Sequence, residues 1–105
     1  ILNDTVECEA VHRVFGAQAT SISVSSTKPI HGHALGAAGA LELAITVKAL
    51  CDGIAPPTIN WLEPDPHCDL NVVPNFARTL PMRAAMSNSF AFGGVNATLV
   101  IERTC

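Results

Sequence analysis

The chain has 105 residues, a formal net charge of −3 at pH 7 and no basic run, so it is long enough for one compact domain and unsuited to nucleic-acid binding. Only 14% of its residues are charged and 49% are hydrophobic, whereas soluble domains average roughly 25% charged residues. A small domain needs polar residues to cover its surface, so we expect much of this surface to be covered by the rest of a longer chain, by a partner subunit or by both.

The first third of the chain predicts a helix followed by a short strand. Asp4 is the expected N-cap, with Glu7 completing a capping box, and Gly16 is the expected stop. The apolar face of this helix is expected to consist of Val6, Ala10, Val11 and Val14. Residues 20–25 alternate polar and apolar side chains, which predicts a strand, and residues 26–32 are expected to form a loop.

A second helix is predicted over residues 36–51, ending at Asp52-Gly53. It is apolar nearly all round, which predicts a central position in the parent fold. The apolar stretch over residues 35–50 contains Glu42 and Lys48 and falls short of the roughly 20 apolar residues that span a bilayer. We therefore expect no membrane span.

The rest of the chain predicts strands. Residues 70–73 are expected to form a short strand, and residues 83–90 and 95–102 a hairpin that turns at Gly93-Gly94. The order of helix, strand, buried helix and strands predicts an α/β layered fold.

The cysteines indicate a reducing compartment. The chain has four of them, without CxxC spacing, and polar residues from Asn3 onward come too early for a signal peptide. We therefore expect reduced thiols, mostly buried as small apolar groups, in a cytoplasmic protein. These cysteines are Cys8, Cys51, Cys68 and Cys105.

The loop before the second helix places Lys28 and His33 next to a helix N-terminus. The free N–H groups there carry partial positive charge, which favours a neutral histidine. A neutral imidazole can donate a hydrogen bond to a carbonyl oxygen and stabilise developing negative charge, as chemistry on a thioester or an enolate requires. Glu42 lies inside the apolar helix and needs a cation or several donors, and Lys28 is a candidate partner. The small residues 36–39 allow another backbone to approach closely.

Two motifs carry a resemblance to a known family. Residues 26–28, Gly32-His33 and residues 36–39 with Glu42 resemble the motif of β-ketoacyl-acyl-carrier-protein synthases of the elongating type I and type II kind. Residues 88–96 are similar to the second signature of that family. The resemblance covers essentially the whole chain. It implies that residues 1–105 are an incomplete domain from the carboxy-terminal half of a thiolase-like layered αβαβα fold.

The branch within the family is suggested by two further positions. Pro29 and His31 differ from the commoner elongating enzymes and resemble the nodulation-protein-E-like branch.

The resemblance also implies an activity. In this family a cysteine accepts an acyl chain from acyl carrier protein, malonyl-carrier protein loses carbon dioxide, and the resulting carbanion attacks the acyl thioester. His33 matches the second of two histidines that stabilise the enolate, Lys28 the active-site lysine, and Phe92 the residue whose backbone N–H helps to form the oxyanion hole. The positions with supporting roles are Glu42, Phe90, Asp4 and Glu7.

The family resemblance also implies ligands and partners. It implies no cofactor, except that some members hold a structural monovalent cation, which here corresponds to Glu7, Glu42, Ser87 and Asn88. The implied partners are acyl carrier protein, acyl and malonyl thioesters, and a second subunit in a homodimer or heterodimer.

The chain also departs from the family pattern. No cysteine stands in the nucleophile motif, and the first catalytic histidine is expected just before Ile1, so we expect a fragment that is inactive alone. Ala91 replaces the usual glycine between the two phenylalanines, and its methyl group narrows the freedom of the backbone.

Plainer alternatives remain for these residues. His33 could satisfy a loop carbonyl, and Lys28 could be a solvated surface lysine. His31 and His33 could ligate a metal, although two histidines without further ligand spacing favour loop packing. Phe90 and Phe92 are expected on one strand face by alternation, where they could pack in the core.

Other functions also remain open. A degradative thiolase carries a cysteine in the glycine loop, and residues 88–96 contain none. A chain-length-factor-like partner or a gene remnant could keep the fold without the activity.

Overall fold

The computed structural model describes residues 2–104. In chain order its helices and strands are α1 (Leu2–Phe15), β1 (Ser23–Val24), α2 (Lys28–His31), α3 (Ala38–Asp52), β2 (Ile54–Ala55), β3 (Asn71–Val72), β4 (Arg78–Thr79), β5 (Ala84–Ala91) and β6 (Val95–Glu102). Short 3-10 helices occupy Gly16–Ser21, Leu35–Ala37 and Phe92–Gly94. This mixture of helices and strands confirms the expected α/β class.

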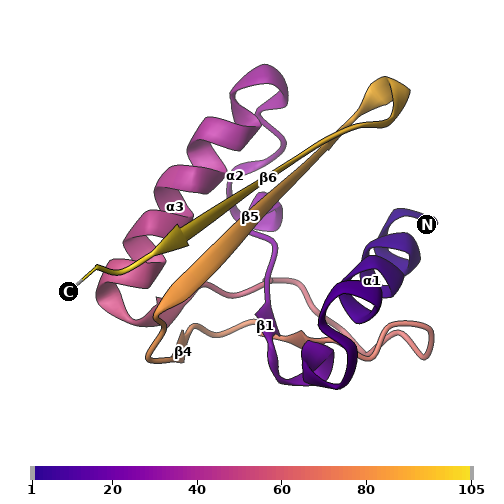
Figure 1. Cartoon of the computed structure of the whole chain (residues 1–105), viewed down its shortest axis with the longest axis horizontal. Helices are drawn as coiled ribbons and strands as arrows, with labels where there is room; N and C mark the ends of the chain where they lie inside the picture. Colours follow the sequence, from indigo (N-terminus) through magenta and orange to yellow (C-terminus); the bar gives the residue numbers. More distant parts are fainter. Residues whose placement is uncertain (1, 105) are drawn as a thin grey trace.

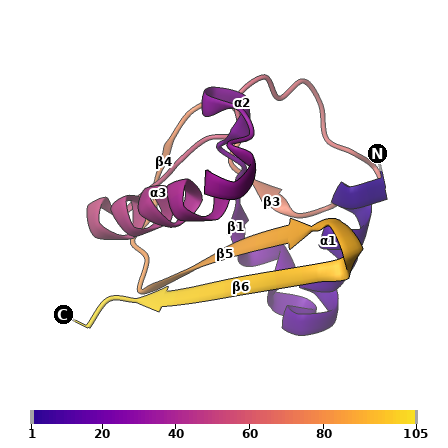
Figure 2. The same cartoon turned by 90° about the horizontal axis from the view of Figure 1, so that it is seen from above.

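The largest sheet is an antiparallel hairpin of β5 and β6. Its register runs from Ala84 opposite Glu102 to Ala91 opposite Val95, which confirms the predicted hairpin. Helix α3 packs along β5, and Figures 1 and 2 show α3 lying beside the hairpin over most of its length. Two small sheets complete the segment, in which β1 pairs parallel to β3 and β2 pairs antiparallel to β4.

Few side chains are buried. The buried apolar residues are Cys8, Val11, Ala19, Ala38, Leu50, Ala55 and Val73. On β6, every residue from 95 to 100 is exposed, and Val47 on α3 is 42% exposed. Large apolar side chains left in water oppose folding, at roughly 25 cal/mol per Å² of apolar surface. Apolar side chains of α3 and of the hairpin are therefore exposed in this segment, as the composition predicted.

Helix α1 differs from expectation at its start and in its buried face. It includes Leu2, so Asp4 lies in the first turn and the predicted N-cap is wrong. An acidic residue still suits that turn, because the helix dipole is positive there. Cys8 and Val11 are buried, whereas Val6 and Val14 are exposed, so only Val11 of the predicted apolar face is in the core of this segment. Its predicted end is confirmed, since Gly16 has φ 54°.

The next segment also differs in part. The expected strand over residues 20–25 shrinks to Ser23–Val24, because residues 16–21 form a 3-10 helix. The expected loop contains the one-turn helix α2, with Pro29 in its first turn, where the fixed φ of proline is already helical. Helix α3 begins at Ala38, slightly later than predicted, and ends at Gly53 with φ 67°, as predicted.

The longest helices of residues 2–104 are too short or too polar to cross a bilayer. Helix α3, with 15 residues, rises about 22 Å, less than the roughly 30 Å of a hydrocarbon core.

The described cysteines are free thiols in different environments. Cys8 is buried and Cys68 is partly buried, but Cys51 is exposed on α3, so the expected burial is wrong for Cys51. Cys105 lies outside the described residues.

Candidate functional site

His33 lies on the connection between α2 and α3, just before the 3-10 turn Leu35–Ala37. The chain turns sharply there, with φ 78° at Gly32 and φ 49° at Leu35. The backbone N–H of Leu35 donates a hydrogen bond of 3.0 Å to Nδ1 of His33. Because a backbone N–H can only donate, Nδ1 carries no proton, and the neutral ring has its proton on Nε2.

This arrangement gives His33 one free donor. The imidazole is exposed in the segment, so Nε2–H is open to a ligand. A neutral ring with an outward N–H can donate to a carbonyl oxygen as negative charge builds on it. The alternative in which His33 satisfies a loop carbonyl does not match Nδ1, which accepts rather than donates.

His31, two residues earlier, is held inside the loop. Its Nε2 lies 2.9 Å from the hydroxyl of Thr27, and its Nδ1 lies 2.7 Å from the carbonyl oxygen of Gly32. A carbonyl only accepts, so Nδ1–H donates to Gly32 and Nε2 accepts from Thr27. Within residues 2–104, no group of three metal-ligating side chains includes His31 or His33, which favours the loop-packing interpretation.

Lys28 and Glu42 form an ion pair between α2 and α3, which confirms the partner expected for Glu42. The Glu42 side chain is only 13% exposed and that of Lys28 is 39% exposed. A carboxylate this buried is costly without a cation, so the pair ties α2 to the helix behind it. The intervening loop, which carries His33, is thereby held at both ends.

Glu7 of α1 lies beside the same lysine. The pKa of Glu7 is raised above its ordinary value, first by burial and then by the charge of Asp4, while the charge of Lys28 and a hydrogen bond with the Asn88 side chain lower it. Asn88 on β5 accepts a hydrogen bond of 2.9 Å from the hydroxyl of Thr98. Its amide nitrogen therefore remains free to donate to Glu7. Residues of α2 and β5 thus influence the pKa of a carboxyl group on α1.

These groups bear on the predicted monovalent cation. One ammonium group, Lys28, faces two carboxylates, Glu7 and Glu42. The formal charge of these three groups is therefore negative, and the pKa of Glu7 is raised first by burial and then by the charge of Asp4. Carboxylate and amide oxygens are ligand types that suit a hard cation, so the cation site at these residues stays a prediction.

The two sequence motifs meet where α3 packs on β5. A methyl group added to Gly39 would lie 3.5 Å from Oγ of Ser89. This is an ordinary van der Waals separation, and the neighbouring atom belongs to a side chain, whereas a Cβ at Gly36 would meet nothing within 4 Å. The close approach of another backbone that was expected at residues 36–39 is therefore not seen at either glycine.

The hairpin tip carries the predicted oxyanion residue. Phe92 lies in the 3-10 turn Phe92–Gly94, after β5, so the expectation that Phe90 and Phe92 share a strand face is wrong. The strand ends because Gly93 and Gly94 take φ 79° and 76°, a left-handed conformation that glycine adopts freely. Phe90 is 47% exposed and Phe92 fully exposed, so neither packs in the core of this segment.

Ala91 causes no strain at this tip. Its backbone has φ −128° and ψ 165°, an extended conformation open to any residue. The methyl group that replaces the usual hydrogen is therefore accommodated in the conformation seen here.

Thr98, the partner of Asn88, was not among the residues predicted for the site. The signal was available, because a hairpin that turns at Gly93-Gly94 pairs residue 88 with residue 98. By contrast, no pattern of neighbouring residues predicts that Lys28 and Asn88 influence Glu7.

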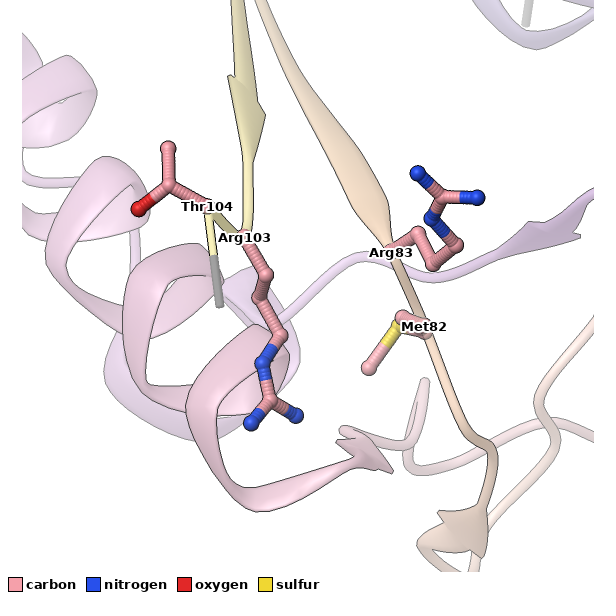
Figure 3. A pocket seen from close by; sticks show the side chains of 4 residues that line it. All are labelled: Met82, Arg83, Arg103 and Thr104. Atoms are coloured by element: carbon pink, nitrogen blue, oxygen red, sulfur yellow. The ribbon is translucent and has the colours of Figure 1, made fainter.

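A hollow of about 530 Å³ lies at the open end of the hairpin, far along the strands from Phe92. Figure 3 shows the four side chains that line it, Met82, Arg83, Arg103 and Thr104. None of the candidate residues lines this hollow.

Comparison with known proteins finds a matching family and similar chains. Residues 1–62 match the family described as "Beta-ketoacyl synthase, C-terminal domain". Nodulation protein E of Rhizobium sp. (strain N33) is 54% identical over 101 residues, which are 96% of this chain and 25% of that protein. The 3-oxoacyl-[acyl-carrier-protein] synthase 2 of Coxiella burnetii (strain RSA 493 / Nine Mile phase I) is 54% identical over 100 residues, 95% of this chain and 24% of that protein.

A solved structure is similar as well. It is a type II PKS acyl-carrier protein in complex with its ketosynthase bound to the hexaketide, with a TM-score of 0.91 and 34% identity over 94% of this chain and 24% of that chain. The chain thus spans about a quarter of the length of these relatives. The likeness extends over nearly the whole segment, in agreement with the two motifs and the thiolase-like fold.

Proposed function

The chain belongs to the β-ketoacyl synthase family, and we propose that its full-length parent is a condensing acyltransferase. The parent joins acyl and malonyl groups on acyl carrier protein, with loss of carbon dioxide, to give a 3-oxoacyl-carrier protein. The observation that carries this proposal is the hydrogen bond from Leu35 N–H to His33 Nδ1, which leaves Nε2–H as an outward donor. Residues 1–105 supply part of the site, and an upstream cysteine and histidine supply the rest.

The proposed chemistry uses this donor at the malonyl thioester. When carbon dioxide leaves, the electron pair of the broken carbon–carbon bond forms an enolate whose charge lies on the thioester oxygen. His33 Nε2–H donates to that oxygen, and an electrostatic donor of this kind contributes about 10²–10³ in rate. The carbanion then attacks the acyl thioester carbon and expels the upstream thiolate. The backbone N–H of Phe92 stabilises the oxyanion formed in that step.

Lys28 and Glu42 act as positioning residues in this scheme, because their ion pair holds the two ends of the loop that carries His33. Phe90, Asp4 and Glu7 support the same region.

The direct test of this proposal uses the full-length parent with acyl- and malonyl-acyl carrier protein. Release of carbon dioxide and formation of a 3-oxoacyl-carrier protein are expected. Absence of both products would overturn the proposal in favour of a non-catalytic chain-length-factor-like partner. The ion pair of Lys28 and the free Nε2–H donor of His33 favour a catalytic parent over a non-catalytic partner.

We also propose partners and a location for the parent. The solved relative contains a ketosynthase in complex with an acyl-carrier protein, which supports carrier protein as the partner here. The exposed apolar residues of β6, Val95, Leu99 and Val100, support coverage by the upstream part of the parent and by a second subunit of a homodimer or heterodimer. Free thiols support a cytoplasmic location. The equal identities to nodulation protein E and to synthase 2 leave acyl chain type to product analysis.

The isolated segment is expected to lack a cooperative fold, because the apolar surfaces of α3 and β6 have no cover. Residues 1–105 expressed alone should be insoluble, or should bind a hydrophobic dye without a sharp thermal transition, as molten states do. Co-expression with the upstream part of the parent should restore cooperative melting. A sharp melt from an isolated monomer would contradict this expectation.

A monovalent cation near Glu7 is proposed as a structural ligand, held by Glu7, Glu42, Ser87 and Asn88. It would offset the negative charge that two carboxylates leave around one lysine. It takes no part in the reaction steps given above.

The melting temperature of the parent should depend on the negative charge of Glu7. The pKa of Glu7 is raised, first by burial and next by the charge of Asp4, so the folded state favours the protonated carboxyl group. The stability that Glu7 contributes is therefore full below its ordinary pKa of 4.5 and is lost as the pH rises through the raised pKa of the folded state. In buffer without alkali cations, Glu7→Gln should therefore melt at a higher temperature than wild type at pH 7, with the difference closing near pH 4. Sodium or potassium should narrow the gap at pH 7.

The matched control for Glu7→Gln is Glu9→Gln. Glu9 is exposed on the same helix and pairs with Arg13, so its loss should change melting little. Equal effects of both substitutions, or no response to either cation, would reject the cation proposal.

A further inference from the structure

Three metal-ligating side chains outside the catalytic group meet where α1 faces the loop that precedes β3. The Sγ of Cys8, Nε2 of His12 and one carboxylate oxygen of Asp69 lie within 4.8 Å of one another. His12 Nε2 lies 2.6 Å and Cys8 Sγ 3.9 Å from Asp69 Oδ1. Figure 1 shows the loop, in salmon, beside the indigo helix α1.

We infer that Cys8, His12 and Asp69 form a binding site for a thiophilic divalent cation of the Zn²⁺ type. Thiolate, imidazole and carboxylate are the three ligand classes that zinc accepts, and three protein ligands leave the fourth position to water. None of the three residues takes part in the proposed condensation.

The observed separations are close to those of a tetrahedral site. Bond lengths of about 2.3 Å to sulfur and about 2.0 Å to nitrogen and oxygen place sulfur about 3.5 Å, and nitrogen about 3.3 Å, from the carboxylate oxygen. The observed separations are 3.9 Å and 2.6 Å. Cys8 Sγ and the His12 nitrogen lie within 4.8 Å of each other and have to approach to about 3.5 Å. The other two separations are each within about 1 Å of the tetrahedral value, and a shift of the carboxylate toward Cys8 and away from His12 corrects both. Asp69 can make this adjustment because its side chain is 70% exposed.

The helix pre-positions the other two ligands. Cys8 and His12 are four residues apart on α1, so they lie on one face, a turn apart. Cys8 is buried and the His12 side chain is 35% exposed, which restricts both rotamers. Metal binding replaces the thiol proton of Cys8, which passes to the buffer. The bound cation would tie α1 to the loop before β3 and stabilise the parent by mass action.

Cys68 is the neighbouring thiol that tests the ligand set. Burial and then a hydrogen bond with Cys68 raise the pKa of Cys8 to about 11. Cys68 is nevertheless outside the group of three described above. The inference therefore predicts that Cys68 is dispensable for binding.

The experiment uses the reduced, metal-stripped full-length parent titrated with Co²⁺ alone. One equivalent should produce a thiolate-to-cobalt charge-transfer band, and Zn²⁺ should displace it. Cys8→Ser, His12→Gln and Asp69→Asn should each weaken cobalt binding more than tenfold, since each removes a ligand. Asp69→Asn changes an exposed side chain, so its effect is separable from misfolding, which circular dichroism checks.

The controls keep residue type constant. Cys51→Ser, Cys68→Ser and His67→Gln change residues of the same types outside the group, and each should leave the band in place. The inference is overturned if no band appears, if Asp69→Asn binds cobalt as wild type does, or if loss of Cys68 abolishes the band. Condensing activity is not a readout here, so this result is independent of the proposed function.

Discussion

Replacing His33 with alanine in the full-length parent is expected to lower the rate of malonyl-carrier-protein decarboxylation by about 10²–10³-fold. The substitution removes the Nε2–H donor that the Leu35 hydrogen bond leaves free. Negative charge then builds on the thioester oxygen with one donor fewer. Release of labelled carbon dioxide, measured at saturating malonyl-carrier protein, reports this step separately from acyl transfer.

A graded series separates the donor from the shape of the loop. His33→Gln keeps a side-chain N–H and should retain more activity than His33→Ala. His67→Ala, a change in an exposed loop histidine, should leave the rate unaffected. Both His33 variants should melt as wild type does, because the ring is exposed. Undiminished decarboxylation by His33→Ala would reject its catalytic role.

The second large effect is expected at the ion pair of Lys28 and Glu42. Lys28→Ala leaves the carboxylate of Glu42, only 13% exposed, without its cation, and an unsatisfied group of this kind costs about 1–3 kcal/mol. The parent should unfold at lower urea concentration, and decarboxylation should also fall because the loop that carries His33 loses its tie to α3. Equilibrium unfolding followed by urea titration measures the first effect.

A double-mutant cycle identifies the cause. Glu42→Gln in the Lys28→Ala background removes the buried charge and should restore part of the lost stability. The matched control is Lys48→Ala, since Lys48 pairs with Asp52 on the exposed side of the same helix and such pairs contribute only about 0.3–0.5 kcal/mol. If Lys28→Ala and Lys48→Ala destabilise the parent equally, the Lys28 pair has no structural role beyond that of a surface contact.

Several local features could be predicted because their signals lie within a few residues. The second helix, its end at Gly53 and the hairpin turn at Gly93-Gly94 follow from periodicity and from glycine, and the structure confirms all three. The need of Glu42 for a cation followed from the position of its carboxylate inside an apolar helix, and Lys28 meets it. Short helices and strands were harder to predict from the sequence, because α2 has only four residues and β1 only two.

Which faces are buried could not be read from α1 alone. Val6, Val11 and Val14 are equally apolar in the sequence, yet only Val11 is buried. The choice depends on which neighbour packs against the helix.

The sequence by itself determined the family, the apolar character of α3, the hairpin and the residues that carry the proposed chemistry, because motifs and periodicity are properties of adjacent positions. Only the tertiary structure decided that Lys28 and Asn88 influence the pKa of Glu7, that His33 is left with a single outward donor, and that Asp69 approaches Cys8 and His12 from 61 and 57 residues away. Contacts over such separations form when helices and strands pack, and no local pattern encodes them.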